Sequence, residues 1–326
     1  MQFIEHQPGD VIPLSASGNL VSPAHILEAD SINAVNAAIA AQRPLLVRGE
    51  PGVGKSQLAR AVAIALNWAF IPFVMDARTE SRDLLWHFDA IERLAEAQLQ
   101  GALGGSKADI RTAMAVEKFI SPGPLWWAFN WAKADTQAQH LKHSPPPQPD
   151  GGDHTAGCVV LIDEIDKAET DVPNGLLEAL GQCSFTPQGL DQPVTVSDNA
   201  PLVIIATNEE RALPDAFIRR CVVLHLHTPD VQTEREKFVN YLVQRGQAHF
   251  PNMHASELNT AANLVAQDRS QALDHSLTPL PGVAEYLDLL RAMAHLPEDG
   301  TFAERLRQVA AFTVRKHPEL QQKTSA

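Results

Sequence analysis

The sequence has few cysteines, fewer basic than acidic residues and no long apolar run, and each of these shortages excludes a class of protein. Its 326 residues include only three cysteines, Cys158, Cys183 and Cys221, without CxxC spacing. An odd, scattered set argues against disulfides or a zinc site and favours reduced core thiols in a cytoplasm. No run of about 18 apolar residues is present to cross a bilayer. The first ten residues lack a basic stretch followed by an apolar one, so we expect no secretory signal and no membrane partner.

Acidic residues outnumber basic ones, with 39 Asp and Glu against 26 Lys and Arg, which gives a formal net charge of −13. This balance argues against nucleic acid as a partner bound through a general basic surface, although a local basic pore is compatible with it. At roughly 100 to 200 residues per domain, the length allows about two domains. We therefore expect a globular, cytoplasmic protein whose partners are proteins or small ligands.

Five short apolar runs, each followed by turn residues or a helical pattern, give the sequence an α/β rhythm. They are residues 45–47, 70–75, 159–162, 202–206 and 222–226. Short, continuously apolar runs are typical of buried parallel strands. Pro72 cannot donate a ladder hydrogen bond, which places the second run at the rim of the sheet. Between the first two runs, apolar residues on one face of residues 55–66 predict the crossover helix of a βαβ unit.

The pattern changes after residue 226, where apolar residues take up helical spacing. Pro229 breaks helices and lies where the periodicity switches, so we place a domain boundary there. The prediction is an α/β core over residues 1–228 and an all-helical domain over residues 229–326. Within the core, residues 133–157 are rich in proline and glycine and predict a flexible, exposed insertion.

A complete GxxxxGK[ST] motif follows the first predicted strand and opens the first predicted helix. It consists of Gly49, Glu50, Pro51, Gly52, Val53, Gly54, Lys55 and Ser56. Its glycines let successive backbone N–H groups converge on phosphate oxygens, and the helix N-terminus adds its positive end. Lys55 is expected to reach the β- and γ-phosphates, and the Ser56 hydroxyl to bind Mg²⁺. We expect a nucleotide site over this motif and the next residue, Gln57; the alternative is a chance glycine-rich turn.

A second motif narrows the chemistry, because a phosphate loop alone would also suit a small-molecule kinase, a GTPase or a nucleotide sensor. Residues 158–164 predict a buried strand that ends in two adjacent carboxylates, Asp163 and Glu164. Successive side chains along a strand point to opposite faces of the sheet, so the two carboxylates cannot have the same role. Asp163 would orient a Mg²⁺ ligand or its water, and Glu164 would polarise the attacking water as a general base. The alternative is a solvated acidic turn that opens a helix.

Polar side chains at two further places fit the same site. Asn208 follows the strand over residues 202–206, where it can position water near a γ-phosphate, although asparagine is also a common turn former there. Arg219 and Arg220 end a short helix before the last strand. An arginine supplied in trans stabilises transition-state charge, and one far from its own phosphate loop implies a neighbouring subunit. Arginines at a helix C-terminus also serve as dipole partners or in salt bridges.

Together, the strings GEPGVGKS, CVVLIDEID, ATNEE and AFIRRC resemble the AAA+ ATPases and, within them, the MoxR-like group. The resemblance covers most of residues 20–326. It implies a P-loop NTPase fold, in which helices sandwich a five-stranded parallel sheet and a small helical lid follows. It also implies ATP as substrate, Mg²⁺ as its metal and a homo-oligomer in the form of a hexameric ring. In this group the output is remodelling of a protein client, often with a partner that carries a von Willebrand A domain. Residues 184–196 look like the β-hairpin that the group inserts before the Asn-bearing strand.

The resemblance assigns roles residue by residue. Lys55 and Ser56 correspond to the group's phosphate and Mg²⁺ contacts. Asp163 corresponds to its metal-side carboxylate and Glu164 to its catalytic carboxylate. Asn208 corresponds to the residue that senses the γ-phosphate.

The resemblance also bears on the two arginines and on the lid. Arg220 aligns best with the group's trans-acting arginine, and Arg219 is the fallback. Members of the group usually present a basic residue at the start of a lid helix, but residues 276–282 contain no Lys or Arg here. Either Arg269 or Arg291 substitutes, or the contact is absent and lid closure is weaker.

Other functions stay open at this stage. A nucleic-acid or restriction-type motor on the same core, using ATP or GTP, is opposed by the acidic balance. A nucleotide-binding switch with little turnover is opposed by the intact Glu164. A small-molecule kinase is opposed because the sequence shows no element that would bind the phosphate acceptor. Trp126, Trp127 and Trp131 form a cluster that could grip a substrate in a pore, but a core or subunit-interface role is favoured.

Overall fold

The computed structural model describes residues 2–16, 23–103, 107–169, 171–197, 199–297 and 299–316. The chain forms two compact units. The first comprises residues 1–6, 30–48 and 59–224, and the second comprises residues 7–29, 49–58 and 225–326. The phosphate loop therefore belongs to the unit that also contains the C-terminal helices.

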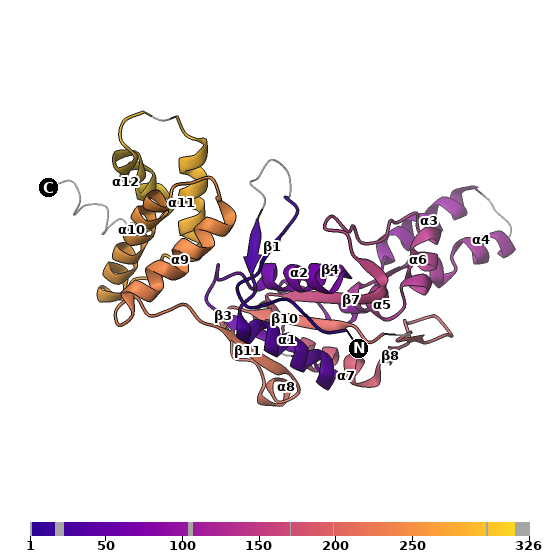
Figure 1. The fold of residues 1–326 in the computed structure, drawn as a ribbon. Coiled ribbons are helices and arrows are strands. Elements are labelled where there is room, and N and C mark those ends of the chain that lie inside the picture. Colours follow the sequence, from indigo (N-terminus) through magenta and orange to yellow (C-terminus); the bar gives the residue numbers. More distant parts are fainter. Residues whose placement is uncertain are drawn as a thin grey trace. The chain divides into compact units, whose positions relative to one another are not determined.

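A five-stranded parallel sheet forms the frame of the fold (Figure 1). Its spatial order is β11 (Val222–Leu226), β3 (Leu45–Gly49), β10 (Leu202–Thr207), β7 (Asp153–Asp163) and β4 (Trp68–Val74). The five apolar runs thus form the five predicted strands. Pro72 lies in the edge strand β4, as predicted, because an edge position tolerates a residue that cannot donate to a ladder.

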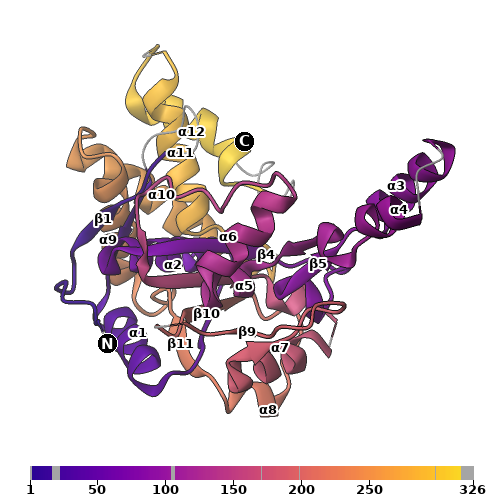
Figure 2. The same cartoon turned by 90° about the vertical axis from the view of Figure 1, so that its right-hand side faces the viewer.

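Helices cover both sides of the sheet (Figures 1 and 2). They include α1 (Ala29–Ala41), α2 (Lys55–Leu66), α5 (Pro124–Phe129), α6 (Trp131–His140), α7 (Asp171–Gln182) and α8 (Asp215–Ile218). On one face, Val160 and Ile205 pack into a core with Trp126, Trp127 and Leu176. The central strands are buried on both faces, which explains why they read as continuous apolar runs. The two tryptophans are core residues, in agreement with the favoured interpretation.

Several short elements extend this unit. An antiparallel pair, β5 (Trp86–Phe88) and β6 (Ile120–Pro122), flanks α3 (Ala90–Leu103) and α4 (Lys107–Ala113), which project away from the sheet (Figure 2). Short 3₁₀ turns lie at η1 (Ser81–Leu84), η2 (Val116–Phe119) and η3 (Ile165–Lys167). The expected hairpin forms from β8 (Ser184–Phe185) and β9 (Val194–Thr195).

The segment 133–157 differs from the expected flexible insertion. Its first part continues α6, and its last part belongs to β7. Between them, the Gln148 side chain accepts from the Phe70 N–H at 2.8 Å and donates to the Phe70 carbonyl at 3.0 Å. The buried carboxylate of Asp150 pairs with Arg60. A side-chain amide that bonds the edge strand and a buried ion pair order a segment whose proline content predicts irregular structure.

The cysteines are free, but only two of them are core thiols. Cys158 and Cys221 are buried, and burial raises the pKa of the Cys158 thiol to about 12. Cys183 is exposed, which corrects the expectation that all three lie in the core. It takes a left-handed conformation (φ +51°) directly after α7, at the turn into the hairpin.

The second unit is built on four helices: α9 (Arg235–His249), α10 (Ala255–Asp274), α11 (Val283–His295) and α12 (Phe302–Thr313). Their apolar faces meet around Phe238, Leu258 and Tyr286, and the Tyr286 hydroxyl donates to the Leu258 carbonyl at 3.1 Å. A small hairpin, β1 (Val11–Pro13) and β2 (Ala24–Ile26), belongs to the same unit. The helical C-terminal region is as predicted. In the described part of the chain, no helix combines the length and apolarity needed to span a bilayer.

Candidate functional site

The phosphate loop joins β3 to α2 and curves around its own lysine. Gly52 (φ +78°) and Gly54 (φ +100°) take left-handed conformations that favour glycine, so the motif's spacing has a backbone cause. Lys55 is the first residue of α2 and is only 6% exposed. Its ammonium donates to the carbonyls of Gly49 at 2.8 Å and Glu50 at 3.0 Å. The loop thus holds a buried positive charge at a helix N-terminus, an arrangement suited to phosphate.

The C-terminal helices pack closely against this loop. A Cβ built on Gly52 would lie 2.7 Å from the Cβ of Ala284, in the first turn of α11. Any side chain at position 52 would therefore collide with α11 in addition to straining the backbone. Ala284 occupies the start of the helix where a basic residue is expected from the resemblance.

Arg269 of α10 contacts the phosphate loop through Glu50. The residue is 6% exposed, and its Nη2 donates to both carboxylate oxygens of Glu50 at 2.8 Å. Nη1 donates to the Pro281 carbonyl at 3.0 Å. Arg291 instead pairs with Asp288 at 2.6 Å. Of the two candidate arginines, Arg269 is therefore the one that reaches the loop, and it reaches a loop carboxylate.

His25 of β2 flanks the loop and is held neutral. A Cβ built on Gly54 would lie 3.7 Å from the His25 ring. Burial, followed by the positive charge of Arg245 and the proximity of His249, lowers the pKa of His25 to about 4. Burial also lowers the pKa of His249. A protonated imidazole at this position is therefore disfavoured while the unit is folded.

The lowered pKa of His25 predicts a loss of stability in acid. Because the folded-state pKa of His25 lies below its ordinary value of 6.5, its contribution is complete above pH 6.5 and is lost as the pH falls toward 4. The full shift corresponds to about 3 kcal/mol at about 1.36 kcal/mol per pKa unit. Urea unfolding between pH 7.5 and 4.5 should therefore show a smaller loss for His25→Asn than for the wild type. His140→Asn, at an exposed position, is the matched control; equal losses in all three proteins would contradict the prediction.

The two adjacent carboxylates at the end of β7 have different surroundings. Asp163 is the last strand residue, and its Oδ1 accepts from the Glu164 N–H at 3.0 Å. Glu164 has a left-handed conformation (φ +58°), which turns the chain into η3. Its Oε2 lies 2.9 Å from the Lys167 ammonium, and this hydrogen bond raises the pKa of Lys167. Both side chains of this pair are partly exposed, with 31% for Glu164 and 41% for Lys167.

The sheet brings the ends of its three central strands together. In the register of β10, Thr207 lies opposite Arg48 of β3, and Ile205 lies opposite Ile162 of β7. Asn208 therefore follows a strand whose neighbours lead directly into the phosphate loop and the acidic pair. Its N–H donates to Asp166, a 2% exposed carboxylate that the sequence analysis did not single out.

The two arginines lie where the sequence predicts, directly after α8. Arg219 and Arg220 are both exposed, and the Arg219 carbonyl accepts from Arg43 at 3.4 Å. Exposed guanidinium groups at this position are accessible to a second molecule.

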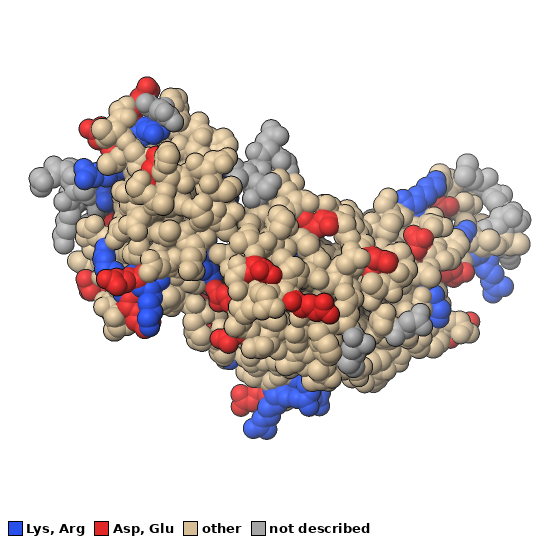
Figure 3. All heavy atoms as spheres, in the orientation of Figure 1, with Lys and Arg blue, Asp and Glu red and all other residues tan. Residues whose placement is uncertain are grey.

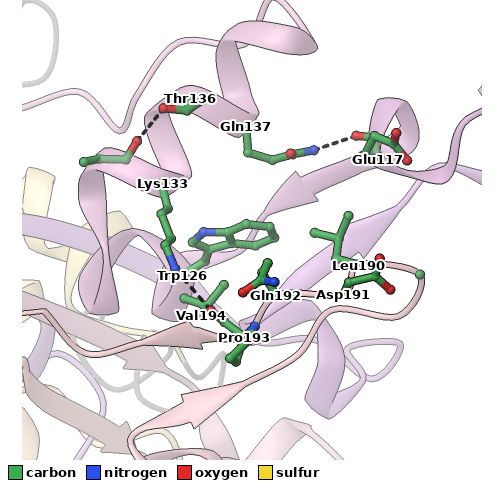
Figure 4. A pocket seen from close by; sticks show the side chains of 12 residues that line it. Glu117, Trp126, Lys133, Thr136, Gln137, Leu190, Asp191, Gln192, Pro193 and Val194 are labelled. Atoms are coloured by element: carbon green, nitrogen blue, oxygen red, sulfur yellow. Dashed lines mark hydrogen bonds between the residues drawn. The ribbon is translucent and has the colours of Figure 1, made fainter.

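A cavity of about 590 Å³ lies in another part of the first unit. Trp126 lines it together with residues of α6 and of the loop between β8 and β9 (Figure 4). Lys133 donates to the Pro193 carbonyl at 3.2 Å, and Gln137 donates to the Glu117 carbonyl at 2.6 Å. These two polar side chains form hydrogen bonds with other residues that line the cavity. No residue of the phosphate loop or of the acidic pair lines it.

On the face drawn in Figure 3, acidic side chains are scattered among the described residues, and basic side chains gather in a small group at the lower edge of the view. The described residues also contain no group of three or more His, Cys, Asp or Glu that could hold a metal ion.

The parallel sheet, with a phosphate loop after β3 and carboxylates after β7, defines a P-loop nucleoside triphosphatase fold. A family model described as AAA domain (dynein-related subfamily) matches residues 44–221, more than half of the chain. The protein belongs to this family of AAA+ ATPases, whose members commonly form oligomeric rings.

Two solved structures are similar to the chain. One is a protein from Cytophaga hutchinsonii described as a candidate ATPase, with 15% identity and a TM-score of 0.39 over 90% of this chain and 83% of that one. The other is a point mutant of RuvB from Thermotoga maritima, with 14% identity and a TM-score of 0.43 over 86% of this chain and 67% of that one. None of the curated proteins compared with the chain matches it.

Proposed function

We propose that the protein hydrolyses ATP, with the phosphates held by the loop over residues 49–57. The observation that carries this proposal is the loop itself, in which left-handed glycines surround the buried Lys55 ammonium. This ammonium donates to two loop carbonyls. Phosphate oxygens would replace those carbonyls as acceptors, because charge-assisted bonds to anions are the stronger ones.

The remaining roles are proposed on chemistry and chain position. Ser56 and Asp163 supply oxygen ligands suited to Mg²⁺, which when bound neutralises the developing charge on the phosphates. Glu164 accepts the proton of the attacking water as general base. Asn208 orients that water near the γ-phosphate. Lys167 competes for the Glu164 carboxylate, so Glu164 must share or leave this ion pair to act.

We further propose that Arg220 acts on the nucleotide of a neighbouring subunit in a ring, with Arg219 as the alternative. Arg220→Ala should leave ATP binding unchanged and lower turnover by about 10³-fold. Mixing it with Lys55→Ala subunits should restore part of the turnover, because each variant supplies what the other lacks. Phosphate release from each protein and from the mixture measures this, with Arg219→Ala as the matched variant. Full activity of isolated Arg220→Ala monomers contradicts the trans arrangement.

The output proposed for the ring is remodelling of a protein client, as in the MoxR-like group, with a von Willebrand A domain protein as a candidate partner. The support is the set of matching motifs, the hairpin from β8 and β9, and the acidic composition. We propose a cytoplasmic location for the protein, with a core over residues 1–228 and a lid over residues 229–326.

Phosphate release with ATP, with GTP, and with ATP plus duplex DNA tests the function directly. Hydrolysis of ATP without DNA stimulation supports the proposal. Salt-dependent stimulation by DNA would favour a nucleic-acid motor. Binding without turnover in the assembled particle would favour a nucleotide switch. The particle mass with and without a slowly hydrolysed ATP analogue reports the assembly.

A further inference from the structure

The turn after β10 is held by a buried carboxylate from a different strand end. Asp166 lies in η3, three residues beyond the end of β7, and is 2% exposed. Its Oδ1 accepts from the Asn208 N–H at 3.3 Å, and its Oδ2 accepts from the Glu210 N–H at 3.1 Å. We propose that Asp166 is a positioning residue of the nucleotide site, which fixes the turn that carries Asn208. This inference rests on the proposed function, because Asn208 matters only if a γ-phosphate is cleaved nearby.

Packing alone gives no reason for a carboxylate at this position. Burial of a carboxylate is costly unless its oxygens accept hydrogen bonds, and an apolar residue of similar volume would fill the space without that cost. The side chain uses one oxygen for each of two N–H groups, on either side of Glu209. Two such charge-assisted bonds fix both the distance of the turn from η3 and its orientation relative to η3.

The turn is also strained and is clamped from its other side. Glu209 has φ +62°, a left-handed conformation that is uncommon for residues other than glycine and persists where neighbouring groups hold it. Its N–H donates to the Thr207 hydroxyl at 3.0 Å, and its carboxylate forms an ion pair with Arg48 of β3. Asp166 therefore acts from the β7 side and Arg48 from the β3 side, with Asn208 on the turn between them.

Asp166→Asn in the full-length protein tests the inference by three measurements. Because the amide places an N–H₂ group against one backbone N–H, hydrogen exchange at the Asn208 and Glu210 amides should accelerate. A displacement of about 1 Å in a positioned group typically lowers kcat by about 100-fold, so we expect a loss of about 10- to 100-fold. The Kd for ATP should stay within about twofold, since phosphate-loop contacts are unaltered. Asp215→Asn, an exposed carboxylate on α8, is the matched control and should change none of the three.

A double-mutant comparison separates positioning from general destabilisation. In an Asn208→Ala background, Asp166→Asn should cause no further loss of kcat, because the group that it positions is gone. An equal loss in both backgrounds, wild-type kcat in Asp166→Asn, or unchanged exchange at the two amides each overturns the inference. If Asp166→Asn is too unstable to assay, Asp166→Glu keeps the charge, displaces the turn by one methylene and should show the same split between kcat and Kd. Absence of turnover in the wild type would instead contradict the proposed function. Hydrogen exchange at the Asn208 and Glu210 amides would still test whether Asp166 holds the turn.

Discussion

Replacement of Lys55 by alanine is expected to raise the Kd for ATP by about 100-fold. The ammonium is buried at the N-terminus of α2 and bonds the loop carbonyls of Gly49 and Glu50. Hydrogen bonds to charged groups are worth about 1.5–3 kcal/mol each, and two phosphate contacts account for the expected change. Titration of a fluorescent ATP analogue measures the Kd directly.

Two controls separate a lost phosphate contact from a damaged loop. Lys118→Ala removes an exposed ammonium from η2 and should leave the Kd unchanged. Lys55→Arg keeps the positive charge but replaces a compact ammonium by a planar guanidinium, and it should bind ATP poorly as well. Thermal unfolding should show that both Lys55 variants stay folded. Wild-type affinity in folded Lys55→Ala would remove the phosphate loop from the proposed site.

The strands and the phosphate loop could be predicted because their signals are local. A buried parallel strand is a continuous apolar run, and the left-handed glycines at 52 and 54 mark the loop within a few residues. Pro72 locates the sheet edge from one missing N–H. The same reasoning fails for residues 133–157, where proline content suggests irregular structure, but Gln148 and Asp150 are ordered by partners more than 70 residues away.

The contacts that brace the site escape sequence analysis because they join distant residues. Asp166 bonds main-chain N–H groups 42 and 44 residues further along the chain. Because nearly every residue has a main-chain N–H, the sequence does not indicate which of them a carboxylate will bond. Glu50 and Arg269 are 219 residues apart, so only the fold brings them together. Because basic residues are absent from residues 276–282, the sequence left three alternatives for the lid contact: Arg269, Arg291 or no contact. Choosing between them required the packing of α10 against the loop.

Replacement of Glu164 by glutamine is expected to leave the Kd for ATP within about twofold and to lower kcat by about 10²- to 10⁴-fold, the range that general-base catalysis contributes. Glutamine keeps the shape of the side chain and can still accept from Lys167, so the turn into η3 should persist. It cannot accept a proton from water, so only the chemical step is affected. Single-turnover hydrolysis with enzyme in excess measures that step separately from product release.

The neighbourhood of Glu164 offers two informative comparisons. Glu169→Gln changes an exposed carboxylate five residues along the chain and should retain wild-type kcat. Lys167→Met removes the ammonium that bonds Glu164 at 2.9 Å and so competes for its carboxylate, and kcat should therefore be at least as high as in the wild type. A Glu164→Gln protein with wild-type turnover would exclude Glu164 as the base, and a kcat below the wild-type value in Lys167→Met would show that Lys167 does not compete with the water for this carboxylate. If both effects appear, one carboxylate serves in turn as partner of Lys167 and as acceptor of the water proton.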